Sequence, residues 1–415
     1  MAETLHCRFA RPDEIPEVGR MVAHSFPGPT RTPGWWDEQL RDPRYGGGAE
    51  TLLIGAAAGR IVAACQLHPL RQWVAGTALK VAGVGTVAIS PAHRQQRFAG
   101  DLLTAALRAA RARGDVASAL YPFRVSFYRR LGYGDAGAVL QWRVPPASLP
   151  DAPERLSVEV LESAHERVEA LALYDQWARS QTGQLERSGR VWTHLCTLPG
   201  RALFGYRASG GELEGYAFVT YRVDLPRAAR YLEVEELVWT TDAARRGLYG
   251  WLASLGDQWE RLLIRTLPGH RLADWLSEPR LPHDAAPGWG LWTPAATLLM
   301  GPMFRLLDVG AAWEQRRAPD HTSLAVACDV DDPQIEENRG CWRLTFDAGR
   351  VRVERDTAAD LTLRLDISTL SRLYIGALSA TAGVAAGLIA CDRPDLLAPL
   401  DGALTLPVPW TFDRF

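Results

Sequence analysis

The chain has 415 residues, a formal charge of −2 and 47% hydrophobic residues, an ordinary globular composition that excludes a disordered or collagen-like chain. At about 100–200 residues per domain, this length favours roughly two to four domains. The near-neutral charge gives no general attraction to nucleic acid or to anionic membranes. No apolar stretch approaches the roughly 18–20 residues of a membrane span.

The six cysteines are scattered along the chain, and none belongs to a C-x-x-C pair. Such sparse cysteines predict no disulfide scaffold, and the nine histidines are not spaced as metal ligands. The first eleven residues lack the apolar core of a signal peptide. We therefore expect a soluble cytoplasmic protein without a metal site.

Two breaks divide the chain into three segments. The stretch Val144–Pro153 contains four prolines in ten residues, which neither a helix nor a central strand tolerates. A softer break, where two prolines interrupt an apolar run, lies between about Trp289 and Met303. We therefore predict domains over residues 1–146, 147–300 and 301–415.

The residue pattern of the first segment predicts a strand, a helix and a second strand. A strand is predicted over 79–90, with a bulge in its Gly83–Gly85 region. Apolar residues at helical spacing from Phe98 to Ala110 predict an amphipathic helix, which Gly114 ends. A short apolar strand is predicted over 116–121.

The second segment repeats this order. A strand is predicted over 231–240, a capping turn at Thr241 and Asp242, a helix over 247–261 and a short strand over 262–267. The repeat length of about 150 residues indicates a duplicated domain rather than a solenoid.

The third segment has a different order, which is typical of an α+β domain. A helix over 303–315 is followed by strands near 323–329, 340–346, 350–355 and 359–365 and by helices over 367–376 and 381–389.

The connection His93–Gly100 is a candidate anion site, because it delivers a strand to the N-terminus of a helix. The unpaired N–H groups of the first helical turn and the positive end of the helix dipole meet there. Arg94 and Arg97 add charge-assisted donors that suit a pyrophosphate. The alternative interpretation is a solvated basic helix start.

A motif that follows this helix resembles a known superfamily. The stretch Phe127–Tyr133 reads F-Y-R-R-L-G-Y and closely resembles the F-Y-x-x-[FL]-G-[FY] signature of GNAT acyltransferases. The three-segment layout, the stretch Met303–Val309 and the ends Leu373–Gly376 and Val408–Phe415 resemble the Eis family of N-acetyltransferases. The resemblance implies an α+β protein. It has two tandem GNAT folds, with mixed, mostly antiparallel sheets flanked by helices, and a C-terminal α+β domain similar to sterol carrier proteins.

The resemblance also implies an activity, the direct transfer of an acetyl group from acetyl-CoA to a primary amine. Tyr128 matches the general acid that protonates the departing thiolate. The α-carboxylate of Phe415 matches the general base, since the protonated acceptor amine must lose a proton before it attacks. Phe26, Trp35 and Trp36 match the wall of the acceptor pocket, with core packing as the alternative for the tryptophans.

The remaining matches concern the cofactor. The backbone of a splayed strand pairs with the pantetheine arm, a loop holds the pyrophosphate, and the following strand contributes a further contact. The positions are Val87, Ala88 and Ile89 for the strand, Arg94, Gln95, Gln96, Arg97, Phe98, Ala99 and Gly100 for the loop, and Phe123 and Arg124 for the further contact.

The chain departs from the family pattern at three places. Arg97 stands where the pyrophosphate loop usually has glycine, and the equivalent stretch Ala244–Tyr249 of the second segment is expected to bind no cofactor. Arg414 puts a positive charge beside Phe415, which disfavours a polycationic acceptor. The alternative function is therefore a GNAT protein with impaired cofactor binding that acts as an apolar-ligand carrier or an oligomeric scaffold.

The expected partners follow from the same resemblance. They are a small-molecule or peptide amine and other copies of the chain, since the family usually assembles as hexamers. We expect no nucleic acid and no membrane as partners.

Overall fold

The computed structural model describes residues 4–222, 230–280, 294–320 and 322–415. The chain forms two compact units. The first contains residues 1–137, 181–186 and 302–415, and the second contains residues 138–180 and 187–301. The predicted break between Trp289 and Met303 lies partly outside the described residues.

The first unit is built on a seven-stranded sheet. Only the central pair β4–β5 is parallel, whereas the other neighbours are antiparallel. The strands stand in the order β1 (His6–Phe9), β2 (Leu52–Ala57), β3 (Arg60–Val74), β4 (Thr77–Ile89), β5 (Ala117–Leu120), β14 (Met303–Leu306) and β6 (Gly134–Asp135).

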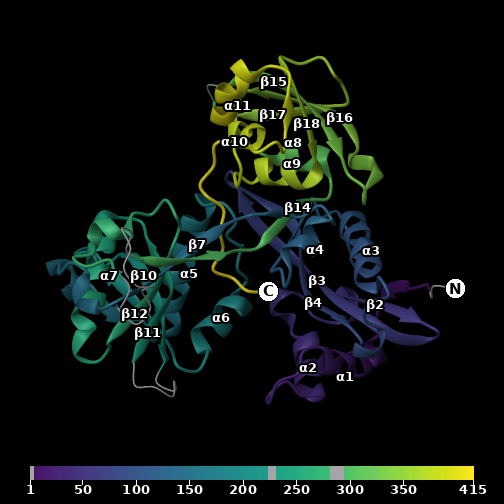
Figure 1. Ribbon diagram of the computed structural model, residues 1–415. Coiled ribbons are helices and arrows are strands. Elements are labelled where there is room, and N and C mark those ends of the chain that lie inside the picture. The colour runs from purple at the N-terminus through teal and green to yellow at the C-terminus, as the bar shows by residue number, and fades with distance from the viewer. Residues whose placement is uncertain (1–3, 223–229, 281–293, 321) are drawn as a thin grey trace. The chain divides into compact units, whose positions relative to one another are not determined.

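Helices cover both faces of this sheet (Figure 1). Helices α1 (Ile15–Ser25) and α2 (Pro33–Arg41) pack on one face, and α3 (Phe98–Ala112) packs on the other. The predicted strand–helix–strand order is confirmed by β4, α3 and β5. Gly114, with a φ of +89°, follows the end of α3 as predicted. The short helix α4 (Val125–Arg129) carries the start of the F-Y-x-x-L-G-Y motif.

The first unit continues into a five-stranded sheet, in the order β17-β16-β15-β18-β19. One apolar core joins this sheet to the first one, because Val81 and Phe304 cluster with Val326 and Leu370. The elements are α8 (Val309–Gln315), β15 (Ser323–Asp331), β16 (Gly340–Asp347), β17 (Arg350–Glu354), β18 (Leu361–Asp366), α9 (Ile367–Tyr374), α10 (Ala380–Ala385), β19 (Ala390–Cys391) and α11 (Leu397–Leu404).

The helix predicted over 303–315 is wrong in its first half. Residues 303–306 form β14, which pairs with β5 and β6. The helix begins only at Val309, because the Asp308 carboxylate accepts a hydrogen bond from the Ala311 N–H at 3.0 Å and caps it. Arg305 on β14 forms a fully buried ion pair with Asp332, at 2.8 Å.

The second unit contains another seven-stranded sheet, in the order β13-β7-β12-β11-β10-β9-β8. Only the pair β11–β12 is parallel. The elements are β7 (Ala138–Val144), β8 (Val158–Val160), α5 (Ala164–Arg179), α6 (Gly189–Thr197), β9 (Arg201–Arg207), β10 (Leu213–Arg222), β11 (Tyr231–Trp239), α7 (Asp242–Ala253), β12 (Arg261–Thr266) and β13 (Ala296–Met300).

The helix predicted over 247–261 is displaced in the structure. Helix α7 begins at Asp242 because the Thr241 hydroxyl caps it, accepting a hydrogen bond from the Ala244 N–H at 3.1 Å. The predicted cap is therefore confirmed, and the helix follows it directly.

Each seven-stranded sheet contains one strand whose position does not follow the order of the sequence. Strand β7 follows the first sheet in sequence but pairs with β12 and β13 of the second sheet. Strand β14 follows the second sheet in sequence but completes the first one. The domain bounds 1–146, 147–300 and 301–415 stay predictions. The α+β class is confirmed, with three mixed sheets.

Candidate active site

An opening between two parallel strands forms the centre of the candidate site. Strands β4 and β5 pair from Val81 with Ala117 to Val84 with Leu120, where β5 ends. Strand β4 continues to Ile89 with only β3 beside it in the ladder. The backbone groups of its last residues that face away from β3 therefore have no strand partner among the described residues, as an extended ligand such as a pantetheine arm requires. The Ile89 carbonyl accepts a hydrogen bond from the Ser25 hydroxyl at 3.1 Å.

A bulge in β4 sets the direction of this last section. The register shifts opposite Ala64 and Gln66, and Thr86 has a φ of +50°. The Thr86 hydroxyl donates to the Gln66 amide oxygen at 3.0 Å. Val87 and Ile89 pack toward the core under α3, whereas Ala88 packs toward α1 and α2. These side chains point away from the opening, which leaves the backbone to line it.

The loop before α3 has the properties of an anion site. Gln95 and Arg97 both adopt the left-handed conformation, with φ values of +65° and +64°. The side chains from Arg94 to Arg97 are exposed, and Phe98 is buried and anchors the helix. Within the described chain, neither Arg94 nor Arg97 pairs with a carboxylate. The Ala99 N–H belongs to the first turn and has no acceptor inside the helix, whereas the Gly100 N–H donates to the Arg97 carbonyl at 2.9 Å.

Tyr128 lies in the apolar cluster on the α3 side of the sheet, together with Val84 and Leu120. Its side chain is 2% exposed, and burial raises the pKa of its phenol well above the usual value. Its hydroxyl donates to no group among the described residues. A protonated phenol without a fixed acceptor is suited to giving up its proton to a leaving group.

Three aromatic rings surround Tyr128, those of Phe123, Phe127 and Tyr133. The rings of Phe123 and Tyr128 stand edge to face, 5.5 Å apart between centroids. Phe123 is 71% exposed, so a large apolar surface borders the site. Arg124 is also exposed and precedes α4. The hydroxyl of Tyr133, by contrast, is held by Ser118 at 2.7 Å and belongs to the core.

The C-terminal end of the chain lies against the face of β4 that is opposite to the Tyr128 side. An ideal Cβ atom on Gly83 would lie 2.7 Å from the Phe415 ring, and one on Gly85 would lie 3.8 Å from the Phe415 carbonyl carbon. A side chain at Gly83 would therefore displace the Phe415 ring or the Leu70 side chain, which a Cβ atom would meet at 2.5 Å. Tyr128 and the end of the chain thus approach the end of the β4–β5 pairing from opposite faces of the sheet.

Two further side chains, those of Tyr121 and His68, lie near the end of the chain. The Tyr121 hydroxyl donates to the Asp413 carbonyl at 2.6 Å, and the Tyr121 and Phe415 rings are 5.6 Å apart. His68 stands opposite Gly83 on β3, and burial lowers its pKa to about 4, so its ring is neutral at pH 7. From the sequence alone, Tyr121 is interpreted as core or pocket wall and His68 as a structural or surface residue, since no local pattern indicates what a distant tail contacts.

Three family models match the chain in succession. An acetyltransferase (GNAT) domain matches residues 6–136, a second acetyltransferase (GNAT) domain matches 183–305, and a sterol carrier protein domain matches 309–411. N-acetyltransferase Eis of Mycobacterium tuberculosis is 29% identical over 412 residues, covering 96% of each chain. An uncharacterized N-acetyltransferase of Streptomyces avermitilis is 26% identical over 437 residues, covering 99% of this chain and 94% of that protein.

The chain is an Eis-like GNAT N-acetyltransferase with a C-terminal sterol-carrier-like domain. Its fold agrees with that of solved structures. A GCN5-related N-acetyltransferase from Anabaena variabilis superposes with a TM-score of 0.85 at 20% identity, covering 99% of this chain and 100% of that chain. Eis1 from Mycobacterium abscessus gives a TM-score of 0.76 at 20% identity, with the same coverage.

The residues predicted to line the acceptor pocket of this Eis-like enzyme gather around α1 and α2. The ring of Trp36 lies 5.8 Å from Phe26 and 4.8 Å from Trp35. Phe26 and Trp36 pack partly against the core of that face, the same face that Phe415 occupies. Core packing therefore accounts for part of their burial, and their role toward an acceptor stays a prediction.

The second GNAT half has no loop that corresponds to the one before α3. Helix α7 starts at Asp242, shortly after β11 ends at Trp239. The stretch Ala244–Tyr249 therefore lies inside the helix. A Cβ atom on Gly247 would lie 2.4 Å from the Tyr206 ring, so this glycine serves close packing.

The described residues contain no group of three or more His, Cys, Asp or Glu side chains that could hold a metal ion. None of their helices is both long enough and apolar enough to cross a membrane.

The role of Arg97 can be tested by titration of acetyl-CoA into the parent protein and into Arg97→Gly. The backbone already has the left-handed φ that glycine favours, so the substitution gives no new access and removes an unpaired guanidinium. We expect the parent to bind acetyl-CoA and the variant to bind it about tenfold more weakly. This difference in affinity should be smaller at high salt, because salt screens the charge of the guanidinium. Tighter binding by Arg97→Gly would mean that the arginine blocks the site.

Proposed function

We propose that this Eis-like enzyme transfers the acetyl group of acetyl-CoA directly to a primary amine. Tyr128 is the general acid and the terminal carboxylate of Phe415 is the general base. The observation that carries the proposal is the approach of Phe415 to Gly85, at the point where β4 and β5 part. A carboxylate there has the location that deprotonation of an incoming amine requires.

The proposed reaction uses each group once. The Phe415 carboxylate takes a proton from the ammonium of the acceptor, and the freed nitrogen attacks the thioester carbonyl carbon. Backbone N–H groups from Val87 to Ile89 stabilise the carbonyl oxygen as it gains negative charge. The new C–N bond forms, the C–S bond breaks, and Tyr128 gives its proton to the departing thiolate. The amide nitrogen then loses its remaining extra proton and Tyr128 regains one through solvent. The Phe415 carboxyl releases its proton to solvent, so one proton is set free overall. The position of Tyr128 beside the end of the β4–β5 pairing supports this role, and its phenol is protonated at neutral pH.

Binding of acetyl-CoA divides between two elements. The backbone of Val87–Ile89 would pair with the pantetheine arm, and the loop Arg94–Gly100 would hold the pyrophosphate. The unpaired guanidinium groups of Arg94 and Arg97 support this assignment. The exposed ring of Phe123 and the guanidinium of Arg124 would add contacts beside Tyr128.

The sequence also allowed an apolar-ligand carrier built on the C-terminal domain. The centre of that domain is filled by large buried side chains, among them Trp313, Arg316 and Tyr374. Arg316 donates to the carbonyls of Tyr374 and Leu404, at 3.0 and 2.7 Å, and so braces the ends of α9 and α11. This packing favours a structural role for the domain. Cytoplasmic location and assembly into a homohexamer stay predictions.

The charge of the acceptor can be tested with a panel of amines and a thiol assay for released CoA. Arg414 is exposed and pairs with no carboxylate among the described residues, so it repels polycations near Phe415. We expect kcat/KM for an aromatic monoamine to exceed that for a tetra-amine by about tenfold, or about 1.4 kcal/mol. Arg414→Glu should narrow this ratio. A tetra-amine preference that Arg414→Glu leaves unchanged would contradict the assignment.

A further inference from the structure

A short piece of the predicted middle domain, residues 147–300, belongs to the first unit. Residues 181–186, here called the clamp segment, lie in the chain between α5 and α6, whose residues belong to the second unit. The segment pairs with the end of β3. The N–H of Gly183 donates to the Trp73 carbonyl, and the N–H of Trp73 donates to the Gln184 carbonyl, each at 2.8 Å.

The clamp segment also holds the C-terminal tail. The N–H of Trp410 donates to the Thr182 carbonyl at 3.0 Å. The side-chain amide of Gln184 makes two further bonds, since its nitrogen donates to the Trp410 carbonyl at 3.2 Å and its oxygen accepts from the Phe412 N–H at 3.4 Å. Gln184 is fully buried, so its amide is committed to the tail.

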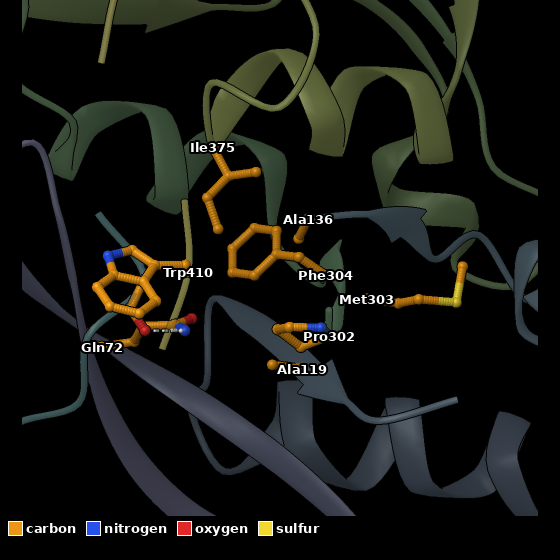
Figure 2. A pocket seen from close by; sticks show the side chains of 9 residues that line it. Gln72, Ala119, Ala136, Pro302, Met303, Phe304, Ile375 and Trp410 are labelled. Carbon is orange, nitrogen blue, oxygen red and sulfur yellow. Dashed lines mark hydrogen bonds between the residues drawn. The ribbon is translucent and has the colours of Figure 1, made fainter. Parts of the chain in front are cut away.

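Contact between the clamp segment and the tail is close enough to require glycine. A Cβ atom on Gly183 would lie 2.5 Å from the Trp410 carbonyl oxygen and 2.8 Å from its nitrogen. Gly183 also has a φ of +97°, which side-chain-bearing residues rarely adopt. Gln72 on β3 donates to the Gly183 carbonyl at 2.8 Å and lies with Trp410 around a small cavity (Figure 2). The position of Trp410 is thus fixed from several sides.

The held part of the tail lies immediately before the end of the chain. After Phe412, the Asp413 carbonyl accepts from Tyr121, and Phe415 lies beside Gly83 and Gly85. Few backbone torsions separate Phe412 from Phe415. A displacement of Trp410 or Phe412 is therefore passed on to the terminal carboxylate rather than absorbed.

We propose that the clamp segment positions the terminal carboxylate for catalysis, with Gly183 and Gln184 as positioning residues. This inference rests on the proposed role of Phe415 as general base. It gives residues 181–186, which lie within the predicted middle domain 147–300, a part in the proposed reaction, because they fix the position of the base. The clamp residues act through Phe415 and need no contact with either substrate.

The first test is Gly183→Ala, with Gly189→Ala as matched control. The new methyl group in Gly183→Ala must push Trp410 away, and a misplacement of about 1 Å can cost about 10²-fold in rate. We expect kcat to fall by about 10²-fold with an unchanged Kd for acetyl-CoA. Gly189→Ala should leave kcat unchanged, because a Cβ atom there meets nothing within 4 Å. Equal kcat for Gly183→Ala and the parent would overturn the inference.

A second variant covers the case in which Gly183→Ala does not fold. Gln184→Glu keeps an acceptor for the Phe412 N–H but loses the donor to the Trp410 carbonyl. We expect its kcat to fall by at least tenfold, with cofactor binding and the unfolding midpoint as controls on the fold. A parent-like kcat in folded Gln184→Glu would also count against the inference.

Removal of Phe415 separates the inference from the proposed function. In a protein lacking Phe415, adding Gly183→Ala should cause no further loss, since both changes act through one carboxylate. A further loss of about 10²-fold would place the action of Gly183 elsewhere and overturn the inference. Full activity without Phe415 would overturn the proposed base and the inference with it. An inactive protein without Phe415, beside fully active clamp variants, would overturn the inference alone.

Discussion

Removal of Phe415 is expected to lower kcat by about 10²–10⁴-fold, the usual contribution of a general base. Without this residue the new chain end lies at Arg414, and the carboxylate no longer reaches Gly85. The fold should survive, because the tail remains held by the clamp segment up to Phe412. Steady-state kinetics with acetyl-CoA and the best monoamine measure the effect.

Two controls separate the carboxylate from the ring. Phe415→Ala keeps a terminal carboxylate but loses the packing against Gly83, so an intermediate rate is expected. An added glycine after Phe415 keeps the ring and displaces the carboxylate, so a rate close to that of the deletion is expected. If the extended chain works as fast as the parent, the terminal carboxylate is not the base.

Tyr128→Phe is expected to lower kcat by about 10²-fold while acetyl-CoA still binds. The substitution removes only the hydroxyl, and the ring contacts to Phe123 and Phe127 are kept. The effect should shrink for a thioester whose leaving thiol is more acidic, since such a thiolate needs less protonation. An equal loss for both thioesters would contradict the role of general acid.

The matched control for this variant is Tyr133→Phe, whose hydroxyl bonds to Ser118 in the core. It should lower the unfolding midpoint and leave the leaving-group dependence unchanged. The pH profile gives an additional check. Burial raises the pKa of Tyr128, so its acid form persists at least to its ordinary pKa of about 10, and ionisation of Tyr128 should cause no loss of rate below that pH.

Elements whose structure depends on neighbouring residues in the chain could be predicted from the sequence. Strand β4, helix α3 and the cap at Thr241 follow from spacing, capping residues and glycines, and the structure confirms them. The F-Y-x-x-L-G-Y motif led to the family because it is local and specific.

Other features depend on distant partners and could not be predicted from the sequence. Residues 303–306 are compatible with a helix and become β14 because β5 offers a free edge. The clamp segment has no periodic pattern of its own, and its place beside β3 depends on the tail that covers it. The resemblance supplied a role for Phe415, but its contacts with Gly83 and Tyr121 required three-dimensional structure.

Strand β14 belongs to the first sheet although it follows the second sheet in the sequence. This order has a consequence for synthesis on the ribosome. The first sheet cannot be completed when β1 to β6 emerge from the ribosome. Strand β14, which pairs with both β5 and β6, is translated only after the strands of the second sheet. Until then the nascent chain carries an open strand edge, which invites pairing with other chains. A truncated chain that ends before Met303 would carry this edge permanently. The first GNAT half is therefore not a separable module, and its folding is completed only late in translation.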